Sequence, residues 1–389
     1  MNVLMIGLGA EVLVAQHGDA RDRHLAYASA AGGLTMIVSA SGRRDLRPRR
    51  LSEHLVVYPL SPWFKPAFVW RAYRLGARIC RERPIDLIVT QDPFSTGLVG
   101  YALKRRFRIA LLINNHSRFL DNPFWLAERP IRHRLFNLLG KTLIRRAEGL
   151  RVVNEAERLT YLSSGGDRQR IRVLPTPVSL ARFLAVPAAA DLDAARRRLA
   201  LSGRRVLLWV GRRWEPAKDL PVLLRALRTV AGRYPDVVLI LVGDLTTAPP
   251  LRHLMEELGL ESHLRLPGVV RHEELPVYYH LCELYVHSSR YEGVAKVMIE
   301  AAAAGKAVVS TRIPGIDAVL EEGETGLLVP IGDAAGLAAG VIELLSDPGR
   351  AQRMGEIARQ RVVARFEPDA MIEAIVQMWR DVSRAGTAE

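Results

Sequence analysis

The most constraining feature of the sequence is a repeated alternation of short apolar runs with longer segments of helical periodicity. The apolar runs are rich in Val, Ile and Leu without two-residue alternation, which is typical of strands buried on both faces of a parallel sheet. The alternation occurs in both halves of the chain, so we predict two doubly wound α/β domains. The predicted strands span residues 3–6, 35–39, 55–58, 87–90, 110–114 and 149–153, and then 206–210, 237–242, 264–266, 284–287, 307–310 and 326–329.

A change in composition marks the boundary between these domains. We place the first domain at residues 1–183 and the second at 204–366, with an Ala- and Asp-rich linker at 184–203. The last segment, 367–389, repeats apolar residues at helical spacing and is predicted to pack back across the junction. Asp191-Leu192-Asp193 has the form of a metal-binding DxD sequence. With no strand before it, we interpret it as capping the helix that carries three consecutive arginines.

Basic residues are concentrated in the first half of the chain. Residues 1–200 contain 33 Lys and Arg against 16 Asp and Glu, whereas residues 201–389 contain 22 against 25. The resulting positive field suits anionic lipid headgroups, a diphosphate-bearing acceptor or nucleic acid. Hydrophobic and basic residues also interleave around Trp63-Phe64-Lys65, Trp70-Arg71 and 136–146, which favours peripheral contact with an anionic membrane. The alternatives are solvated charge of an arginine-rich composition and ordinary helices packed on a sheet.

The cysteines and the apolar runs bear on the compartment. Only two cysteines occur, Cys80 and Cys282, far apart and without a partner motif, which indicates a reducing compartment and no disulfide or metal framework. No run reaches the roughly 18 apolar residues that span a bilayer. The segment 2–15 lacks a basic leader and carries Glu11, so a buried strand is favoured over a signal peptide. We expect a cytoplasmic protein, which a membrane contact would hold at the inner face of the cell membrane.

Two glutamates flank a predicted anion site in the second half. A strand ends at Ser288, Gly293 allows a tight turn, and a helix is predicted to begin near Val294. The free N–H groups of a helix start attract anions. Glu292 lies in the turn and Glu300 eight residues later, which on a continuous helix places them about 80° apart. Carboxylates at both ends of a phosphate pocket suit a ligand with a sugar at each end. The alternative interpretation of Glu300 is a solvent-exposed helix residue without a ligand.

A glycine and two cations follow the first strand of the second half. Gly211 permits close approach of the backbone, and Arg212 and Lys218 are predicted to lie in the loop before the next helix. A guanidinium and an ammonium six residues apart can clamp a diphosphate and offset its growing charge as it leaves.

The second half as a whole resembles the retaining glycosyltransferases of family four, which have two facing Rossmann-like domains with a cleft between them (the GT-B type). The resemblance covers residues 204–345 and departs from the family pattern at Ser288, Asp219 and Ala318, where proline, glycine and glutamate are frequent. The motifs that carry it are Glu292-x7-Glu300, Gly211-Arg212 to Lys218, Pro267-Gly268-Val269, Val308-Val309-Ser310 with Pro314-Gly315, and Glu321 to Val329.

The resemblance implies roles for these residues. Glu300 would hold the nucleotide ribose, and Glu292 would contact the donor sugar. Arg212 and Lys218 would grip the diphosphate. The other implied donor-binding residues are Gly211, Val269 and the backbone of Gly293, Val294 and Ala295. No metal and no cofactor are expected, because protein cations neutralise the diphosphate.

The first half is similar to bacterial polysaccharide-assembly members of the family. The similarity lies in Gln91 to Gly97, Phe119 to Trp125, Arg151 to Glu155 and Pro175 to Val178. His116 follows a predicted strand and, by resemblance, would donate a hydrogen bond to the transferred sugar, although this chain reads His116-Ser117-Arg118 where His-Gly-Asp is common. Asp19, in the loop 7–24, would border the acceptor.

These observations favour a retaining, metal-independent hexosyltransferase. It would move a sugar from a nucleotide diphosphate sugar to an acceptor hydroxyl, with a lipid-linked saccharide of surface polysaccharide assembly as the favoured acceptor and nucleic acid not expected as a partner. The alternatives are an epimerase or phosphorylase on the same fold, or a basic protein that binds membranes or nucleic acid and keeps a vestigial sugar site.

Overall fold

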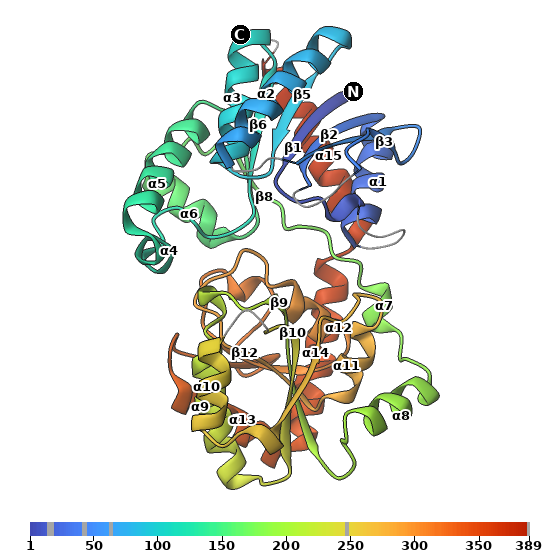
Figure 1. Ribbon diagram of the computed structural model, residues 1–389, viewed down its shortest axis with the longest axis vertical. Coiled ribbons are helices and arrows are strands. Elements are labelled where there is room, and N and C mark those ends of the chain that lie inside the picture. The colour runs from blue at the N-terminus through green and yellow to red at the C-terminus, as the bar shows by residue number, and fades with distance from the viewer. Residues whose placement is uncertain (14–18, 41–44, 62–64, 246–248, 387–389) are drawn as a thin grey trace. The chain divides into compact units, whose positions relative to one another are not determined.

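The computed structural model describes residues 1–13, 19–40, 45–61, 65–245 and 249–386, which form two compact units. The first unit comprises residues 1–177 and 368–389, and the second comprises 178–367. Each unit is an α/β domain with a mainly parallel sheet, as predicted (Figure 1). None of the helices in the described ranges is both long and apolar enough to cross a membrane.

The first sheet has the strand order β3-β4-β2-β1-β5-β6-β7-β8. All neighbouring strands are parallel except β3, which pairs antiparallel with β4 at the edge. The short edge strands β3 and β8 were not predicted. The strands are β1 (Asn2–Gly7), β2 (Gly33–Ser39), β3 (Arg49–Arg50), β4 (Leu55–Leu60), β5 (Leu87–Thr90), β6 (Ala110–Asn115), β7 (Gly149–Val152) and β8 (Ile171–Val173).

Helices cover both faces of this sheet. One face packs against α1 (Asp19–Ala31) and α15 (Pro368–Gly386), whose Trp379 and Val376 are fully buried in the core. The last helix is therefore part of the first unit's own core. The remaining helices of this unit are α2 (Lys65–Glu82), α3 (Ser95–Phe107), α4 (Pro123–Glu128), α5 (Pro130–Arg145) and α6 (Glu155–Ser163), with the 3-10 helix η1 (Glu11–Leu13).

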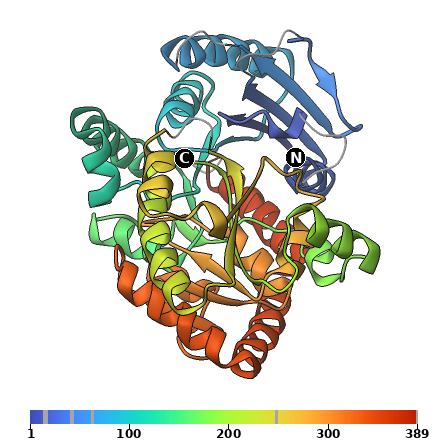
Figure 2. The ribbon, with the colours of Figure 1, turned by 60° about the horizontal axis from the view of Figure 1, so that its bottom comes forward.

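The second sheet is fully parallel, with the order β11-β10-β9-β12-β13-β14. Its strands are β9 (Arg205–Arg213), β10 (Val237–Asp244), β11 (Leu264–Gly268), β12 (Leu284–His287), β13 (Ala307–Thr311) and β14 (Gly326–Val329). Figures 1 and 2 show helices on both sides of it. They are α7 (Ala181–Leu184), α8 (Ala189–Arg198), α9 (Leu220–Arg233), α10 (Pro249–Glu257), α11 (Leu275–Leu281), α12 (Lys296–Ala303), α13 (Ala334–Ser346) and α14 (Pro348–Arg365), with the 3-10 helices η2 (Pro216–Lys218), η3 (Glu261–His263) and η4 (Ile316–Ala318).

The structure divides the chain between Pro177 and Val178, six residues before the predicted boundary at 183. The segment 184–203, expected as a linker, contains α8 and belongs to the second unit. The interpretation of Asp191 as a helix cap is wrong, because the N-cap of α8 is Ala188 and Asp191 lies in the first turn. Asp193 forms an ion pair with Arg196, 3.1 Å away.

Candidate active site

The candidate site lies where the strand order of the second sheet reverses. β9 is the first strand of this sheet and β12 the fourth, and they are neighbours, so the chain builds outward first to one side and then to the other. In doubly wound sheets, ligands bind at the carboxyl ends of the strands at such a switch point. The loops after β9 and β12 carry Lys218 and Glu292, so the fold brings these two predicted residues to the same sheet edge.

Lys218 and Glu292 contact each other directly. The Nζ atom of Lys218 lies 2.5 Å from Oε1 of Glu292, and the Ser289 hydroxyl donates to the same oxygen at 2.8 Å. Burial alone would raise the pKa of Glu292, but the Lys218 ammonium and these hydrogen bonds outweigh it and hold the pKa below its ordinary value. Glu292 is therefore ionised, and both side chains of the pair are largely shielded from solvent.

Hydrogen bonds join the two loops along their length. The Ser288 hydroxyl donates to the carbonyl of Lys218 at 2.8 Å, and the Arg290 backbone N–H donates to the carbonyl of Ala217 at 2.7 Å. The Arg290 guanidinium also binds both carboxylate oxygens of Asp219, at 2.7 and 3.2 Å. Serine at 288, where the family often has proline, thus supplies a donor that proline lacks, and it fixes the backbone that carries Lys218.

Asp219 adopts a left-handed backbone conformation, with φ of 46° and ψ of 43°. Most L-residues avoid this region, while glycine adopts it freely and aspartate is among the few side chains that visit it. The family's glycine at this position is therefore explained by backbone geometry, and the aspartate of this chain satisfies the same geometry while it binds Arg290.

The left-handed geometry predicts an unequal effect of two substitutions at this position. Both Asp219→Ala and Asp219→Gly remove the contact with Arg290, but only alanine is strained by the positive φ. We expect Asp219→Ala to be less stable than Asp219→Gly by about 1 kcal/mol in urea unfolding. Equal stabilities of the two variants would show that the conformation of Asp219 carries no cost.

Glu300 is buried rather than solvated, with 4% of its surface exposed. Its Oε2 lies 2.9 Å from the Tyr279 hydroxyl, and its Oε1 lies 3.1 Å from Nε2 of His272. The helical-wheel angle predicted between Glu292 and Glu300 does not apply, because α12 begins at Lys296 and Glu292 precedes it. The alternative of a solvated helix residue is wrong, and the carboxylate is held in place by two side chains of the preceding segment.

His287, the last residue of β12, lies next to the Lys218–Glu292 ion pair, on the side of Glu292. It is 1% exposed, and its Nε2 lies 3.7 Å from Oε1 of Glu292. Neither ring nitrogen has a hydrogen-bond partner among the residues that the structure describes. Burial lowers the pKa of His287 to about 4, so the imidazole is neutral at pH 7. Neither this histidine nor His272 and Tyr279 was predicted from the sequence.

The other predicted donor-side residues lie at the same sheet edge or near it. Arg212 is exposed near the carboxyl end of β9, inside the strand rather than in the following loop. A Cβ atom at Gly211 would lie 2.2 Å from the ring of buried Trp209, so packing against the indole already requires glycine there. Val269 is 72% exposed just after β11. Gly293, Val294 and Ala295 form the turn before α12.

In the first unit, His116 follows β6 as predicted. Its Nε2 lies 2.6 Å from Oε1 of Gln91, which follows β5, and its Nδ1 lies 3.4 Å from the Thr176 hydroxyl. Because an amide oxygen only accepts, the Nε2 atom carries the proton in this contact. To donate to a sugar from Nε2, His116 has to release or share the Gln91 contact.

A buried carboxyl group near His116 was not predicted. Glu157 in α6 is 3% exposed, and its Oε2 accepts a hydrogen bond from Nδ2 of Asn115 at 2.7 Å. Burial raises the pKa of Glu157 to about 8, against the opposing effects of Arg118 and Asn115. Glu157 is therefore mostly protonated at pH 7, and nothing in the local sequence distinguishes it from the exposed Glu155 of the same helix turn.

The remaining predicted position is Asp19, the first residue of α1. Its side chain and residues 14–18 of the same loop lie outside the described residues, as do Trp63, Phe64 and the side chain of Lys65. Within the described ranges, no group of three His, Cys, Asp or Glu side chains is arranged to hold a metal ion.

Comparison with known proteins assigns the class. Residues 192–361 match the family described as Glycosyl transferases group 1, and residues 23–182 match the family described as Glycosyltransferase Family 4. A D-inositol 3-phosphate glycosyltransferase from Acidothermus cellulolyticus is 30% identical over 371 residues, covering 89% of this chain and 81% of that protein. An alpha-D-kanosaminyltransferase from Streptomyces kanamyceticus is 27% identical over 330 residues, covering 82% of this chain and 83% of that protein.

Solved structures agree on the fold. Sucrose-phosphate synthase from Thermosynechococcus elongatus matches with a TM-score of 0.84 and 23% identity, covering 99% of this chain and 100% of that one. Fold and sequence together define a glycosyltransferase of the two-domain GT-B type. The chain belongs to glycosyltransferase family 4, which confirms the resemblance found in the sequence.

Proposed function

We propose that this glycosyltransferase moves a sugar from a nucleotide diphosphate sugar to an acceptor hydroxyl with retention of the anomeric configuration. The observation that carries the proposal is the Lys218–Glu292 ion pair at the switch point of the second sheet. A cation largely shielded from solvent beside a fixed carboxylate, ahead of a helix N-terminus, suits a ligand that joins a diphosphate to a sugar.

Each charged group has a proposed role in binding the donor. Lys218 exchanges Glu292 for the diphosphate, and Arg212 adds a second positive charge. Glu292, released from Lys218, accepts hydrogen bonds from hydroxyls of the donor sugar. Glu300 accepts from the ribose hydroxyls, and its position is fixed in advance by Tyr279 and His272. His116 in the first unit donates to the transferred sugar.

The proposed reaction breaks the bond between the anomeric carbon and the diphosphate oxygen, and it forms a bond from the same carbon to the acceptor oxygen. Both oxygens lie on one face of the sugar, and the acceptor proton passes to the departing phosphate. The rate enhancement comes from positioning and from stabilisation of the diphosphate charge by Lys218 and Arg212. Because protein cations supply this charge, the proposal includes activity without a divalent metal, which an assay in excess EDTA tests.

The proposed acceptor is a lipid-linked saccharide of surface polysaccharide assembly. The positive charge of the first unit supports it, with 31 Lys and Arg against 18 Asp and Glu, compared with 24 against 23 in the second unit. We place the enzyme in the cytoplasm, at the inner face of the membrane, and the free thiols Cys80 and Cys282 are compatible with that compartment. Nucleic acid is not proposed as a partner.

A thermal-shift panel of nucleoside diphosphates tests the donor site. The complex of Anabaena HepE with UDP and glucose, with a TM-score of 0.78, 20% identity and coverage of 97% of this chain and 98% of that one, makes UDP the first member of the panel. A ligand at 100 times its Kd stabilises the folded state by about 2.7 kcal/mol, which raises Tm by several degrees. Glu300→Ala should remove most of the shift, and Glu257→Ala, an exposed carboxylate of the same unit, should keep it. A full set of nucleotides without any shift would contradict the proposal.

Product analysis separates this reaction from its alternatives. With a donor labelled in the sugar, a transferase gives a glycosylated acceptor whose anomeric proton coupling reports retention. An epimerase would return an altered sugar nucleotide, and a phosphorylase would give a sugar phosphate. Detection of either product in place of the glycosylated acceptor would contradict the proposed function.

A further inference from the structure

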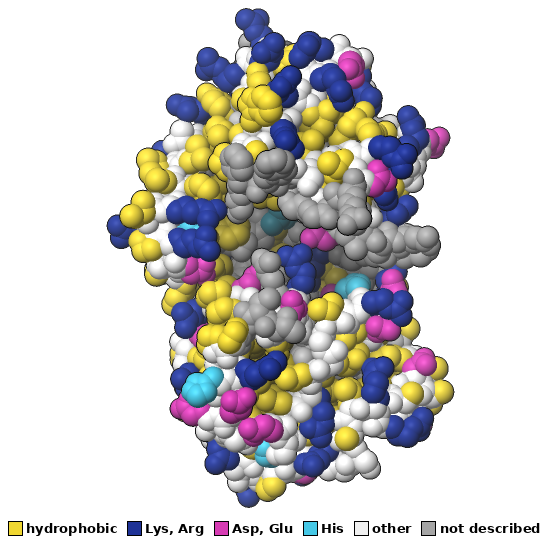
Figure 3. All heavy atoms as spheres, in the orientation of Figure 1, with side chains coloured by type: hydrophobic (Ala, Val, Ile, Leu, Met, Phe, Trp, Pro, Cys, Tyr) yellow, Lys and Arg dark blue, Asp and Glu magenta, His cyan; other side chains and the backbone are white. Residues whose placement is uncertain are grey.

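The outer face of α5 in the first unit is unusually apolar. Ile131, Leu135 and Leu138 are 82%, 63% and 66% exposed, and their spacing of four and three residues puts them on one side of the helix. Leucine and isoleucine rarely stand this exposed in a contiguous row on a soluble protein, and such rows mark interaction sites. Figure 3 shows hydrophobic and basic side chains intermixed in the region where Figure 1 places α4 and α5.

The helix cannot roll to bury this row, because its opposite face is already packed. A Cβ atom at Gly140 would lie 2.9 Å from the Phe94 ring and 3.1 Å from Leu120, so the helix is in close contact there. His133 stacks on Trp125 with ring centroids 4.2 Å apart, and its Nδ1 lies 2.5 Å from the Trp125 carbonyl oxygen. The exposed row is therefore a fixed feature of the folded unit.

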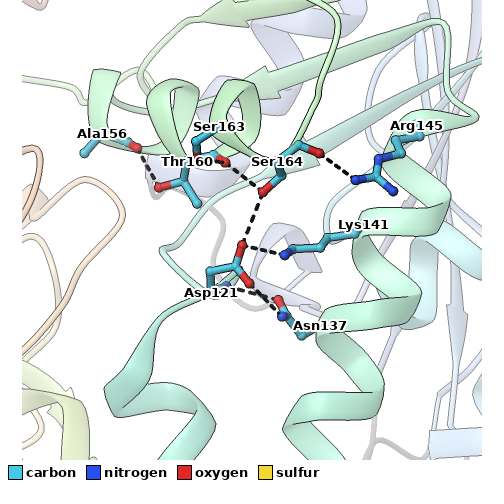
Figure 4. Close-up of polar contacts among 8 residues, drawn as sticks. All are labelled: Asp121, Asn137, Lys141, Arg145, Ala156, Thr160, Ser163 and Ser164. Carbon is cyan, nitrogen blue, oxygen red and sulfur yellow. Dashed lines mark hydrogen bonds and ion pairs between the residues drawn. The ribbon is translucent and has the colours of Figure 1, made fainter.

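One flank of the helix is held by polar contacts (Figure 4). Asp121 accepts from Lys141 at 2.6 Å, from Asn137 at 2.9 Å and from the Ser164 hydroxyl at 3.3 Å. Arg145 donates to the Ser164 carbonyl at 2.6 Å. These contacts tie α5 to the C-terminal end of α6, so the rotation of α5 about its axis is set from two sides.

The apolar row is bordered by arginines. Arg134 is exposed beside it, and Arg132 and Arg146 lie over the rings of Phe136 and Tyr101, at 5.1 and 5.6 Å from the ring centres. Such helices lie in a membrane interface, with the apolar face among the acyl chains and the cations at anionic headgroups.

A second basic surface lies on α2, which packs against α3 as α5 does. Trp70 is 57% exposed, with the guanidinium of Arg74 4.7 Å above its ring. A groove of 540 Å³ beside it is lined by Arg71, Arg74, Arg78, Arg81 and Arg106, and none of the described residues that line it is a carboxylate. Positive charge is therefore present on both α2 and α5, and it is complementary to an anionic surface.

We propose that the row Ile131–Leu135–Leu138 on α5, with its flanking arginines, docks the enzyme on a bilayer that contains anionic lipids. A second copy of the chain is the weaker occupant, because a symmetric dimer through this face would set arginines against arginines. The functional role of this docking rests on the proposed function, because a lipid-linked acceptor is presented at a membrane surface.

Vesicle sedimentation tests the proposal without donor or acceptor, so its outcome is independent of the proposed reaction. The full chain should bind vesicles of phosphatidylcholine and phosphatidylglycerol, bind pure phosphatidylcholine weakly, and lose binding as salt increases. Ile131→Ser with Leu138→Ser should weaken binding by at least about tenfold, because two apolar side chains no longer enter the interface. Arg134→Glu should also weaken it without any change in apolar surface.

The matched control is Ile357→Ser with Val363→Ser on α14, which removes two exposed apolar side chains of the second unit, 38% and 43% exposed. This variant should bind vesicles like the unmodified chain. Failure of the unmodified chain to bind the anionic vesicles would overturn the proposal, and so would unchanged binding by the α5 double variant. A dimer that the α5 variant abolishes, without vesicle binding, would assign the surface to a second copy instead.

Discussion

Lys218→Ala should lower kcat by about 100- to 1000-fold at saturating donor, the loss typical of removing one group that stabilises transition-state charge. The substitution also leaves Glu292 without the cation that lowers its pKa, so burial should raise the pKa of that carboxyl. Lys306→Ala, which removes a lysine that contacts a backbone carbonyl of the same unit, is the control and should stay active. Activity of Lys218→Ala close to that of the unmodified enzyme would mean that the site is misplaced.

Substitutions of Glu292 complete this test. Glu292→Ala should abolish transfer while the fold survives, because the Ser288–Lys218 and Arg290–Asp219 contacts still join the two loops. Glu292→Gln keeps the shape and the ability to accept hydrogen bonds from sugar hydroxyls, but it frees Lys218 from its partner. If the ion pair has to open before the donor binds, Glu292→Gln should bind UDP more tightly than the unmodified enzyme in calorimetry.

The site residues that could be predicted from the sequence, such as Lys218 and Glu292, belong to local motifs. Lys218 and Glu292 each follow an apolar strand, and the rule that carboxyl ends of parallel strands meet at one edge was enough to bring them together. Their direct ion pair was not predictable, because it depends on β9 and β12 being neighbours although they are the first and fourth strands of the sheet. The predicted angle of about 80° between Glu292 and Glu300 is wrong for a different reason, because the helix begins only at Lys296.

The side chains that were missed act over long sequence separations. His272 and Tyr279 reach Glu300 from 28 and 21 residues away, and no spacing rule connects them. His287 belongs to no recognisable sequence motif. Its proximity to Glu292 follows only from its position at the end of the buried strand β12. The segment 184–203 was predicted to link the domains because of its Ala- and Asp-rich composition, but its helix α8 packs against α11 and belongs to the second unit.

Glu157 should make the stability of the protein fall as pH rises from about 5 to 8. Its pKa is about 8 in the folded state against 4.5 for an ordinary glutamate, so within this window the folded state holds a proton that the unfolded chain releases. Its contribution is fully present below the unfolded pKa and is lost as pH rises through the folded pKa. One pKa unit corresponds to about 1.4 kcal/mol, so the whole window is worth up to about 4 kcal/mol in the free energy of unfolding.

The measurement is urea unfolding of the natural chain and of Glu157→Gln at several pH values. Glutamine keeps the bond from Asn115 but has no proton to lose, so the stability of Glu157→Gln relative to the natural chain should grow with pH across this window. The control is Glu155→Gln in the same helix, because Glu155 is exposed and its contact with Arg158 lowers its pKa instead. A stability difference for Glu157→Gln that does not change with pH would contradict a protonated Glu157. In that case the carboxyl group next to Asn115 would be ionised, with Arg118 as the cation that compensates its burial.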